Sequence, residues 1–405
     1  MKFHTMDDLL SKDLKGKRVF VRADLNVPLT EDGKVSDKTR IEKFAPTAIA
    51  LSEAGAKVIV TSHLGRPEGK EAKFSLEQIA EEVANEVEQE VIFVDDCIGE
   101  EVEQTIADMN GGDILLLENL RFYKEEKKCD EEFSKKLANL ADFYVDDAFA
   151  TSHRAHASTF GITNHVPSFA GFLMENELNA LGTILHKPTE IDGGKSGAIV
   201  GGAKVSTKIT VLENLMDKID VLFIGGAMAN TFLLAQGYDM GKSLVEADMV
   251  DVAKTVLKKA EEKGCEIILP VDLVVAPEFK SYEENEVETV AIDAVPADCM
   301  ALDFGSKTLE LIKNKITELE SIVWNGPFGA FEMKPFEKTT FEVADFIAKQ
   351  TQASELTSVG GGGDTVSALK QSGNIEKMTY ISTAGGAFLE YMEGKELPGV
   401  KALEK

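Results

Sequence analysis

The sequence predicts an α/β fold of two domains, each a mainly parallel β-sheet flanked by helices. Its length of 405 residues exceeds what one ordinary hydrophobic core organises. Short apolar runs alternate with amphipathic segments, which is the pattern of parallel strands joined by helical crossovers. The runs of the first half also end in different residues from those of the second half. We therefore expect two sheets, each with its own ligand at the carboxyl ends of its strands.

In the first half, the apolar runs end in charged and polar residues. The runs expected to form strands are RVFVRA (18–23), AKVIVTS (56–62), VIFVD (91–95), DILLLEN (113–119) and DFYVDDAF (142–149). Helical patterns lie between them, among them FSLEQIAEEVANEV (74–87) and DEEFSKKLANL (130–140). Aspartate, asparagine, histidine and arginine follow the strands, so this sheet edge should be polar.

In the second half, glycine pairs stand where the strands are expected to end. The segments are AIVGGAK (198–204), VLFIGGAM (221–228), IVWNGPFGAFE (322–332), SVGGGGD (358–364) and STAGGAF (382–388). Different edge chemistry in the two halves predicts two different ligands. The boundary should fall near 170–195, where NELNALGTILHKP (176–188) is typical of a helix that ends at proline.

Composition restricts the partners and the compartment. The formal net charge of −27 disfavours nucleic acid and anionic membranes as partners. No apolar run reaches the roughly 18 residues of a membrane span, and the first residues lack the apolar core of a signal peptide. The cysteines, Cys97, Cys129, Cys265 and Cys299, are far apart, as expected for reduced thiols in the cytoplasm.

The arginines indicate an anion site in the first half. All six precede residue 155, and the six histidines also stop before the midpoint. Arginine suits bidentate binding of carboxylate and phosphate. A pocket could be lined by Asp24, Asn26, Arg40, His63, Arg66, Arg121 and Arg154, each in a turn or early in a helix. Alternatively, each arginine pairs separately with one of the 70 acidic residues, and for Arg18 and Arg22 we prefer a structural role.

The segment GGAKVSTKI (201–209) is expected to open a helix after a glycine turn. Lys204 and Lys208 would then share one face near the helix N-terminus. Cations are disfavoured there, so a polyphosphate between the lysines would explain them. The alternative is two solvated surface lysines.

The run GGGGDT (360–365) offers backbone donors and one carboxylate. A carboxylate beside phosphate repels it unless Mg²⁺ lies between them, so Asp364 is a candidate for the magnesium side. Asp364 could also cap the following helix, and Thr365 could be a hydroxyl partner or a helix-start residue. Glu332 could accept a hydrogen bond from a ribose hydroxyl.

Together these patterns favour phosphoryl transfer, in which catalysis is mostly positioning and charge stabilisation. One half offers arginines for a phosphorylated acid, and the other offers glycines, two lysines and an acid for a magnesium nucleotide. No convincing general base lies near the glycine loops. A carboxylate acceptor would need none, because it is already ionised at neutral pH.

Eight segments resemble, in order, the successive motifs of the phosphoglycerate kinase family. They are RADLNVP, SHLGRP, LENLRF, DDAFATSHRAHAST, IVGGAKVSTKI, WNGPFGAFE, GGGGDT and STAGGAFLE. The resemblance runs from about residue 15 to the final LPGVKALEK. It implies a kinase of glycolysis and gluconeogenesis, a transferase that moves a phosphoryl group reversibly between 1,3-bisphosphoglycerate and ADP, giving 3-phosphoglycerate and ATP with Mg²⁺.

The resemblance also implies an architecture of two Rossmann-like domains joined by a hinge helix. The phosphoglycerate domain would span 1–174, the connecting helix and hinge 175–190, and the nucleotide domain 191–390. Residues 391–405 would return to the first domain. The family further implies a cytoplasmic monomer that closes by hinge bending.

Site residues carry over from the same motifs. The phosphoglycerate would bind Asp24, Asn26, Arg40, His63, Leu64, Gly65, Arg66, Arg121 and Arg154. The nucleotide would bind Gly202, Ala203, Lys208, Gly225, Gly226, Asn325, Pro327, Glu332, Gly362, Gly363, Asp364 and Thr365, with Asp364 on the metal side. Arg40, Lys204 and Lys208 would act on the transferred group, and the backbone N–H groups of Gly362 and Gly385 would donate to the transition state.

Two positions depart from the family pattern. Alanine stands at Ala150 and Ala384, where the family usually has glycine. If either position required a positive φ, alanine would cost roughly 1 kcal/mol or more, which would affect rate and not the reaction.

Two other functions stay open. A kinase for another small carboxylic acid would have the same general layout, although the ordered motifs argue against it. A nucleotide-binding scaffold without activity is disfavoured by the presence of Arg40, Lys204, Lys208 and Asp364.

Overall fold

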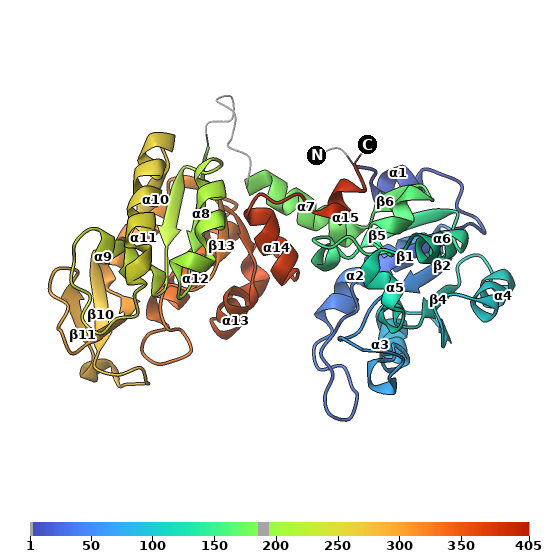
Figure 1. Cartoon of the computed structure of the whole chain (residues 1–405), viewed down its shortest axis with the longest axis horizontal. Helices are drawn as coiled ribbons and strands as arrows, with labels where there is room; N and C mark the ends of the chain where they lie inside the picture. Colours follow the sequence, from blue (N-terminus) through green and yellow to red (C-terminus); the bar gives the residue numbers. More distant parts are fainter. Residues whose placement is uncertain (1–2, 185–193, 405) are drawn as a thin grey trace. The chain divides into compact units, whose positions relative to one another are not determined.

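The computed structural model of the chain describes residues 3–184 and 194–404 (Figure 1). The chain divides into two compact units. The first contains the residues up to Asn179 together with those from Glu396 onward, and the second is Ala180–Lys395. Of the expected connecting segment, residues 185–190 lie outside the described residues.

The first unit is built on a parallel sheet with the strand order β3-β4-β2-β1-β5-β6. Its strands are β1 (Arg18–Ala23), β2 (Lys57–Thr61), β3 (Val91–Val94), β4 (Ile114–Leu117), β5 (Phe143–Asp147) and β6 (Ser168–Ala170). Its helices are α1 (Met6–Leu10), α2 (Thr39–Glu53), α3 (Glu77–Glu86), α4 (Glu100–Asp108), α5 (Lys124–Lys128), α6 (Glu131–Asn139) and α15 (Pro398–Lys401), and α7 (Phe172–Ile184) begins in it.

Helices cover both faces of this sheet, because successive side chains of a strand point to opposite faces. Val19 and Val21 of β1 belong to a buried cluster that includes residues of α2 and α3. Phe20, between them, belongs to a second cluster with residues of α4 and α6. Burial on both faces explains why β1 is an almost continuous apolar run and not an alternating one.

Helix α7 begins earlier than the sequence predicts. The expected start was residue 176, but the helix starts at Phe172. The buried Asp147 carboxylate at the end of β5 accepts hydrogen bonds from the N–H groups of Leu173 (2.8 Å) and Met174 (3.2 Å). The capping carboxylate is 26 residues away in the sequence, so the local sequence pattern could not predict this helix start.

The end of the chain lies against its beginning within the first unit. Phe3 and Glu404 form an antiparallel β-bridge, and α1 and α15 both belong to the first unit (Figure 1). The N–H of Gly399 in α15 donates to the carbonyl of Ser152 (2.9 Å). The last helix is therefore held by backbone contacts with a loop that carries candidate site residues.

The second unit contains another parallel sheet, with the order β15-β14-β13-β7-β8-β9, and a small antiparallel sheet, β11-β10-β12. The parallel strands are β7 (Lys195–Val200), β8 (Val221–Ile224), β9 (Glu266–Ile268), β13 (Leu319–Asn325), β14 (Thr357–Gly360) and β15 (Tyr380–Ile381). The antiparallel strands are β10 (Asp272–Ala276), β11 (Glu288–Ala291) and β12 (Met300–Phe304). The helices are α8 (Ile209–Met216), α9 (Met228–Ala235), α10 (Val250–Lys263), α11 (Ser306–Ile316), α12 (Lys338–Gln352), α13 (Gly363–Gln371) and α14 (Gly385–Met392).

The predicted fold class is confirmed, because the structure is α/β with two mainly parallel sheets flanked by helices. The antiparallel sheet is an addition that the sequence did not reveal. In the described part of the chain, none of the helices has the length and apolar character needed to cross a lipid bilayer.

Candidate functional site

Polar side chains of the first unit gather at the carboxyl edge of its sheet. Strand β1 has β2 and β5 as neighbours, and β2 pairs with β4 on its other side. Asp24 and Asn26 follow β1, His63 follows β2, and Arg121 follows β4. Since parallel strands end at the same edge, the loops after these strands are neighbours.

Hydrogen bonds hold three of these loops together. Arg40 at the start of α2 donates through Nη1 to Oδ1 of Asp24 (2.9 Å) and to the carbonyl of Asn26 (3.2 Å). Oδ1 of Asn26 accepts from the N–H of Gly65 (2.8 Å). Arg121 donates through Nη1 to the carbonyl of Gly65 (2.7 Å). The loops after β1, β2 and β4 therefore form one connected polar surface.

The arginines of this surface repel one another. Burial lowers the pKa of Arg121 to about 10, and the nearby positive charges of Arg22, Arg154 and Arg66 add to the effect. Like charges held this close favour the binding of an anion, which relieves the repulsion. His63 is also buried, and its pKa is held well below the usual range by burial and by neighbouring arginines.

Ion pairing distinguishes some arginines of the first unit from others. Arg18 pairs with Asp142 (2.8 Å), and Arg22 is fully buried, so neither is placed to contact a ligand directly. Arg40 pairs with Asp24 within the connected polar surface, which we call the arginine cluster from here on. Within residues 3–184 and 194–404, Arg66, Arg121 and Arg154 form no ion pair with a carboxylate. Separate surface ion pairs therefore do not explain these three residues.

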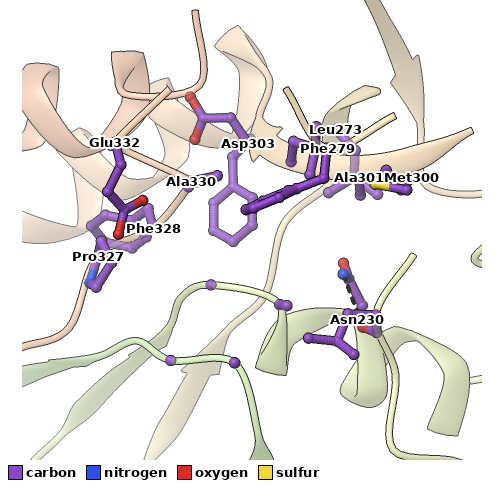
Figure 2. Close-up of a pocket in the computed structure, with 18 of the residues that line it drawn as sticks. Asn230, Leu273, Phe279, Met300, Ala301, Asp303, Pro327, Phe328, Ala330 and Glu332 are labelled. Atoms are coloured by element: carbon purple, nitrogen blue, oxygen red, sulfur yellow. Dashed lines mark hydrogen bonds between the residues drawn. The ribbon is translucent and has the colours of Figure 1, made fainter. Parts of the chain in front are cut away.

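The second unit contains a cavity of about 500 Å³ (Figure 2). Six of the residues predicted for a nucleotide line it: Gly202, Ala203, Gly226, Pro327, Glu332 and Asp364. Figure 2 shows Glu332 and Pro327 on one side, and Leu273, Phe279, Ala301 and Met300 on the other. Asn230 of α9 lies across from them. The volume falls within the range usual for small-molecule and cofactor sites.

One wall of this cavity is apolar, and the sequence did not predict it. It consists of Leu244, Leu273, Phe279, Met300, Ala301, Leu302, Phe304 and Phe328. Leu244 and Phe279 are 52% and 65% exposed, which is unusual for large apolar side chains. Most of this wall comes from or adjoins the antiparallel sheet, so an element that the sequence did not predict supplies it. An apolar wall with an accessible aromatic ring suits a planar heterocycle.

The lysines of GGAKVSTKI do not share a helical face, so that prediction is wrong. Residues Val205–Thr207 form a 3₁₀ turn, and α8 begins only at Ile209. Glu246 holds the turn, because its carboxylate accepts from the N–H (3.0 Å) and the hydroxyl (2.6 Å) of Ser206. Lys204 is consequently extended and exposed, whereas Lys208 is half-buried.

Residues at the ends of two strands, β13 and β14, position Lys208. Its ammonium donates to Oδ1 of Asn325 at the end of β13. The Asn325 amide in turn donates to the carbonyl of Gly361 (2.9 Å). Burial lowers the pKa of Lys208, while the charges of Asp364 and Glu393 raise it. The lysine turn, β13 and the GGGGDT loop therefore meet around this ammonium.

Close backbone contact explains one of the glycine pairs. Gly226, with φ of +69°, donates its N–H to the carbonyl of Phe328 (2.7 Å). A Cβ atom at this position would collide with the backbone of Gly202. Both glycines line the cavity. Glycine is thus required here for the strand-end loops to approach one another.

The GGGGDT loop starts α13, but Asp364 does not cap it. The N-cap is Gly362, with φ of +94°, and Asp364 lies in the first turn. Its carboxylate is exposed, lines the cavity and has no hydrogen-bond partner among the described residues. Thr365 is buried, and its hydroxyl accepts from the N–H of Gly326 (2.7 Å). Gly363 precedes Asp364 at the exposed start of the helix.

Of the other predicted glycines, Gly385 begins α14 and is exposed there. Gly225 lies beside Pro327 and Phe328, where a Cβ atom would be crowded. Neither alanine that departs from the family pattern is strained. Ala384 has φ of −95°, and Ala150 is not among the described residues with positive φ. The cost considered for these alanines therefore does not arise.

Asp303 on β12 is a buried carboxyl beside the cavity, and we expect it to make stability depend on pH. Burial raises its pKa to about 7, although the Thr339 N–H donates to it (3.0 Å). The group binds its proton more tightly in the folded state, so its own contribution to stability is fully present below pH 4 and is lost as pH rises through 7.

The isosteric variant Asp303→Asn removes this titration. We expect the free energy of unfolding of the wild type, relative to the variant, to fall by up to about 1 kcal/mol per pH unit between pH 4 and 7. Urea unfolding at a series of pH values measures the difference. A difference that is constant over this range would show that Asp303 ionises normally.

Nearly the whole chain is similar to known proteins. The family model described as phosphoglycerate kinase matches residues 6–395. The phosphoglycerate kinase of Granulibacter bethesdensis is 54% identical over 404 residues, and that of Rhizobium meliloti is 53% identical over 406 residues; both alignments cover 100% of each chain. The solved structure of phosphoglycerate kinase from Coxiella burnetii is 40% identical, with a TM-score of 0.90, and the match covers 99% of this chain and 98% of that one.

Proposed function

Because the chain belongs to the phosphoglycerate kinase family, it is a kinase that transfers a phosphoryl group to and from a carboxyl group, and we propose how its residues divide this task. In this reaction of glycolysis, 1,3-bisphosphoglycerate and ADP are converted reversibly to 3-phosphoglycerate and ATP. The main support for assigning one substrate to each unit is a contrast between the units. One contains a connected cluster of arginines, and the other contains a cavity with an apolar wall.

The arginine cluster is proposed to bind 3-phosphoglycerate. Its cations would bind the phosphate and carboxylate groups, with Arg66, Arg121 and Arg154 available because they form no ion pair with a carboxylate of the described chain. Asp24 and Asn26 fix Arg40 and Gly65 through the hydrogen bonds described above. Leu64 is buried in the hydrophobic core of the first unit, so its role in binding would be through the backbone.

The cavity of the second unit is proposed to bind ADP and ATP. The apolar wall around Phe279 and Leu244 would contact the base, and Glu332 would accept from a ribose hydroxyl. The phosphates would lie towards Gly202, Lys208 and the start of α13, where backbone N–H groups and a helix N-terminus favour anions.

The chemical step needs positioning and charge stabilisation more than proton transfer. In the direction of ATP consumption, a carboxylate oxygen of 3-phosphoglycerate forms a bond to the γ-phosphorus, and the bond from that phosphorus to the bridging oxygen of ADP breaks. The carboxylate is already ionised, so no general base is required. Arg40, Lys204 and Lys208 are proposed to neutralise the transferred group, and the N–H groups of Gly362 and Gly385 to donate to it.

The residues present fit a magnesium ion carried by the nucleotide. Asp364 offers a carboxylate that is exposed to the cavity and has no partner among the described residues, the kind of oxygen ligand that Mg²⁺ binds. No cluster of three or more His, Cys, Asp or Glu side chains suited to a metal occurs in the described part of the chain. When bound, the ion would neutralise charge on the phosphate oxygens.

Asp364→Ala should weaken binding of the magnesium nucleotide more than binding of 3-phosphoglycerate. A lost metal contact is expected to lower affinity for Mg-ADP about tenfold, while the arginine cluster of the other unit is untouched. Calorimetric titration of each ligand measures both affinities, with Asp345→Ala as a control outside the cavity. If phosphoglycerate affinity fell more than Mg-ADP affinity, the assignment of Asp364 would be wrong.

The division of the chain is also a proposal. Residues 1–174 would act as the phosphoglycerate domain, 191–390 as the nucleotide domain, and 391–405 as a segment returning to the first. We propose a cytoplasmic monomer in which a hinge motion brings the two bound substrates together. In the described residues, Cys97, Cys129, Cys265 and Cys299 form no disulfide, which agrees with this compartment, and the family resemblance supports the rest.

The choice of 3-phosphoglycerate over other small acids is open to a direct test. If the arginine cluster binds a phosphorylated acid, the wild type should bind 3-phosphoglycerate much more tightly than glycerate, acetate or carbamate. Calorimetric titration of all four measures this preference. Equal affinity for glycerate would contradict the proposal and favour a kinase for another acid.

A further inference from the structure

Arg22 is a buried cation whose contacts the proposed reaction does not use. It lies on β1, and only 1% of it is exposed. Its guanidinium donates from Nε to Oγ of Ser158 (3.0 Å), from Nη1 to the carbonyl of Ala23, and from Nη2 to Nδ1 of His63 (3.0 Å). Its three nitrogens thus bond three different groups, which fixes the orientation of the guanidinium plane.

Glu126 on α5 carries the opposite charge, and the hydroxyl group of Ser158 links it to Arg22. It is 1% exposed, and its carboxylate accepts from the N–H (3.0 Å) and the hydroxyl (2.6 Å) of Ser158. The Ser158 hydroxyl therefore accepts from Arg22 and donates to Glu126. A buried charge pair is costly in free energy, and apolar residues of similar volume often replace one without loss of stability. A contribution to stability alone is a weak explanation for this pair.

The contact with Arg22 determines which nitrogen of His63 carries the proton. A guanidinium has only donors, so Nδ1 of His63 must offer its lone pair. The charged or titratable groups that act on this ring are Arg22, Arg121, Arg40 and His156, and with burial they oppose a second proton on it. In the neutral ring the proton then lies on Nε2. That nitrogen has no hydrogen-bond partner among the described residues, so its N–H is available to a ligand.

We propose that Arg22 is a positioning residue, which holds His63 as the neutral Nε2–H tautomer and so presents a fixed hydrogen-bond donor to an oxygen of 3-phosphoglycerate. The inference rests on the proposed function for the ligand, but the tautomer itself does not. Arginine cations attract any anion of suitable charge, whereas an oriented neutral donor discriminates by position. Arg22 thus acts through His63 and does not contact the substrate.

The tautomer can be measured on the unmodified protein. In the ¹⁵N-labelled wild type, the ring nitrogens of His63 are assigned by comparison with His63→Gln. We expect Nδ1 without a proton and Nε2 with one, unchanged from pH 6 to 8. A proton on Nδ1, or titration of the ring within this range, would overturn the proposal. This result does not depend on whether the protein turns over 3-phosphoglycerate.

The link to the substrate requires variants. Replacing Arg22 alone would leave Glu126 buried without its counter-charge, so the double variant Arg22→Met/Glu126→Gln removes both charges together. We expect KM for 3-phosphoglycerate to rise about tenfold, as for a lost hydrogen bond to a charged group, with KM for ADP unchanged. Arg18→Met, on the same strand but in a partly exposed ion pair, is the matched control.

A third background separates positioning from general structural support. If Arg22 acts through His63, the double variant should cause no further rise in KM when His63 is already glutamine. A rise of similar size in that background, or equal rises in KM for both substrates, would refute the positioning role. Absence of turnover with 3-phosphoglycerate in the wild type would instead contradict the proposed function.

Discussion

Arg40→Ala is expected to remove most of the turnover while leaving the affinity for ADP nearly unchanged. Loss of one cation that is proposed to stabilise the transferred group should lower kcat about 10²–10³-fold. Arg40 belongs to the first unit, where it pairs with Asp24, whereas the cavity proposed for ADP is lined by residues of the second unit. The substitution therefore alters charge in the cluster proposed to bind 3-phosphoglycerate and leaves the residues that line the cavity unchanged. Steady-state kinetics and titration with ADP measure the two effects.

The substitution also removes the ion pair between Arg40 and Asp24, so its effect on stability needs a control. Asp24 is buried, and its Oδ2 atom has no hydrogen-bond partner in the described residues. Without Arg40 its charge loses a partner, so the unfolding temperature should be measured alongside activity. Arg18→Ala is the matched control, because it removes a partly exposed arginine paired with Asp142. A comparable loss of ADP affinity in Arg40→Ala would contradict the assignment of two separate pockets.

Lys208→Met is expected to lower kcat by a similar factor, about 10²–10³-fold, and also to weaken ATP binding. Its ammonium lies with Asn325 and near Asp364, at the side of the cavity where the phosphates are proposed to lie. Methionine keeps much of the volume of the side chain and removes the charge. Kinetics with varied ATP, at saturating 3-phosphoglycerate, measures both constants.

Lys259→Met controls for the loss of a lysine in the same unit, since Lys259 pairs with Glu213 away from the cavity. The comparison of Lys208→Met with Lys259→Met also tests indirectly the role proposed for Lys204, which is exposed and extended. If Lys208→Met kept wild-type kcat, charge at this position would play no part in catalysis. The role proposed for the lysine turn would then rest on Lys204 alone.

The sequence was most informative where function depends on residues next to strand ends. The strand 18–23 was predicted with the bounds that β1 has, and Asp24 and Asn26 followed from it. The arrangement of Asp24, Arg40, Gly65 and Arg121 in one hydrogen-bonded surface also agrees with the predicted edge. Buried strands and polar strand ends are local features, so a single sequence can show them.

The sequence was least informative where distant segments decide the geometry. The lysine turn is 3₁₀ and not helical because Glu246 binds Ser206 from 40 residues away. Helix α7 starts early because Asp147 caps it, and the apolar wall of the cavity depends on an antiparallel sheet that was not predicted. Each outcome rests on a tertiary contact, which no spacing of neighbouring residues encodes.

The most direct test of the account is consumption of ATP with and without 3-phosphoglycerate, in the presence and absence of Mg²⁺. The wild type should consume ATP only when both are present and should form ADP and 1,3-bisphosphoglycerate. Acetate or carbamate should not replace 3-phosphoglycerate. Consumption that is as fast with acetate, or no consumption under any of these conditions, would contradict the central claim that this chain transfers a phosphoryl group to the carboxyl group of 3-phosphoglycerate.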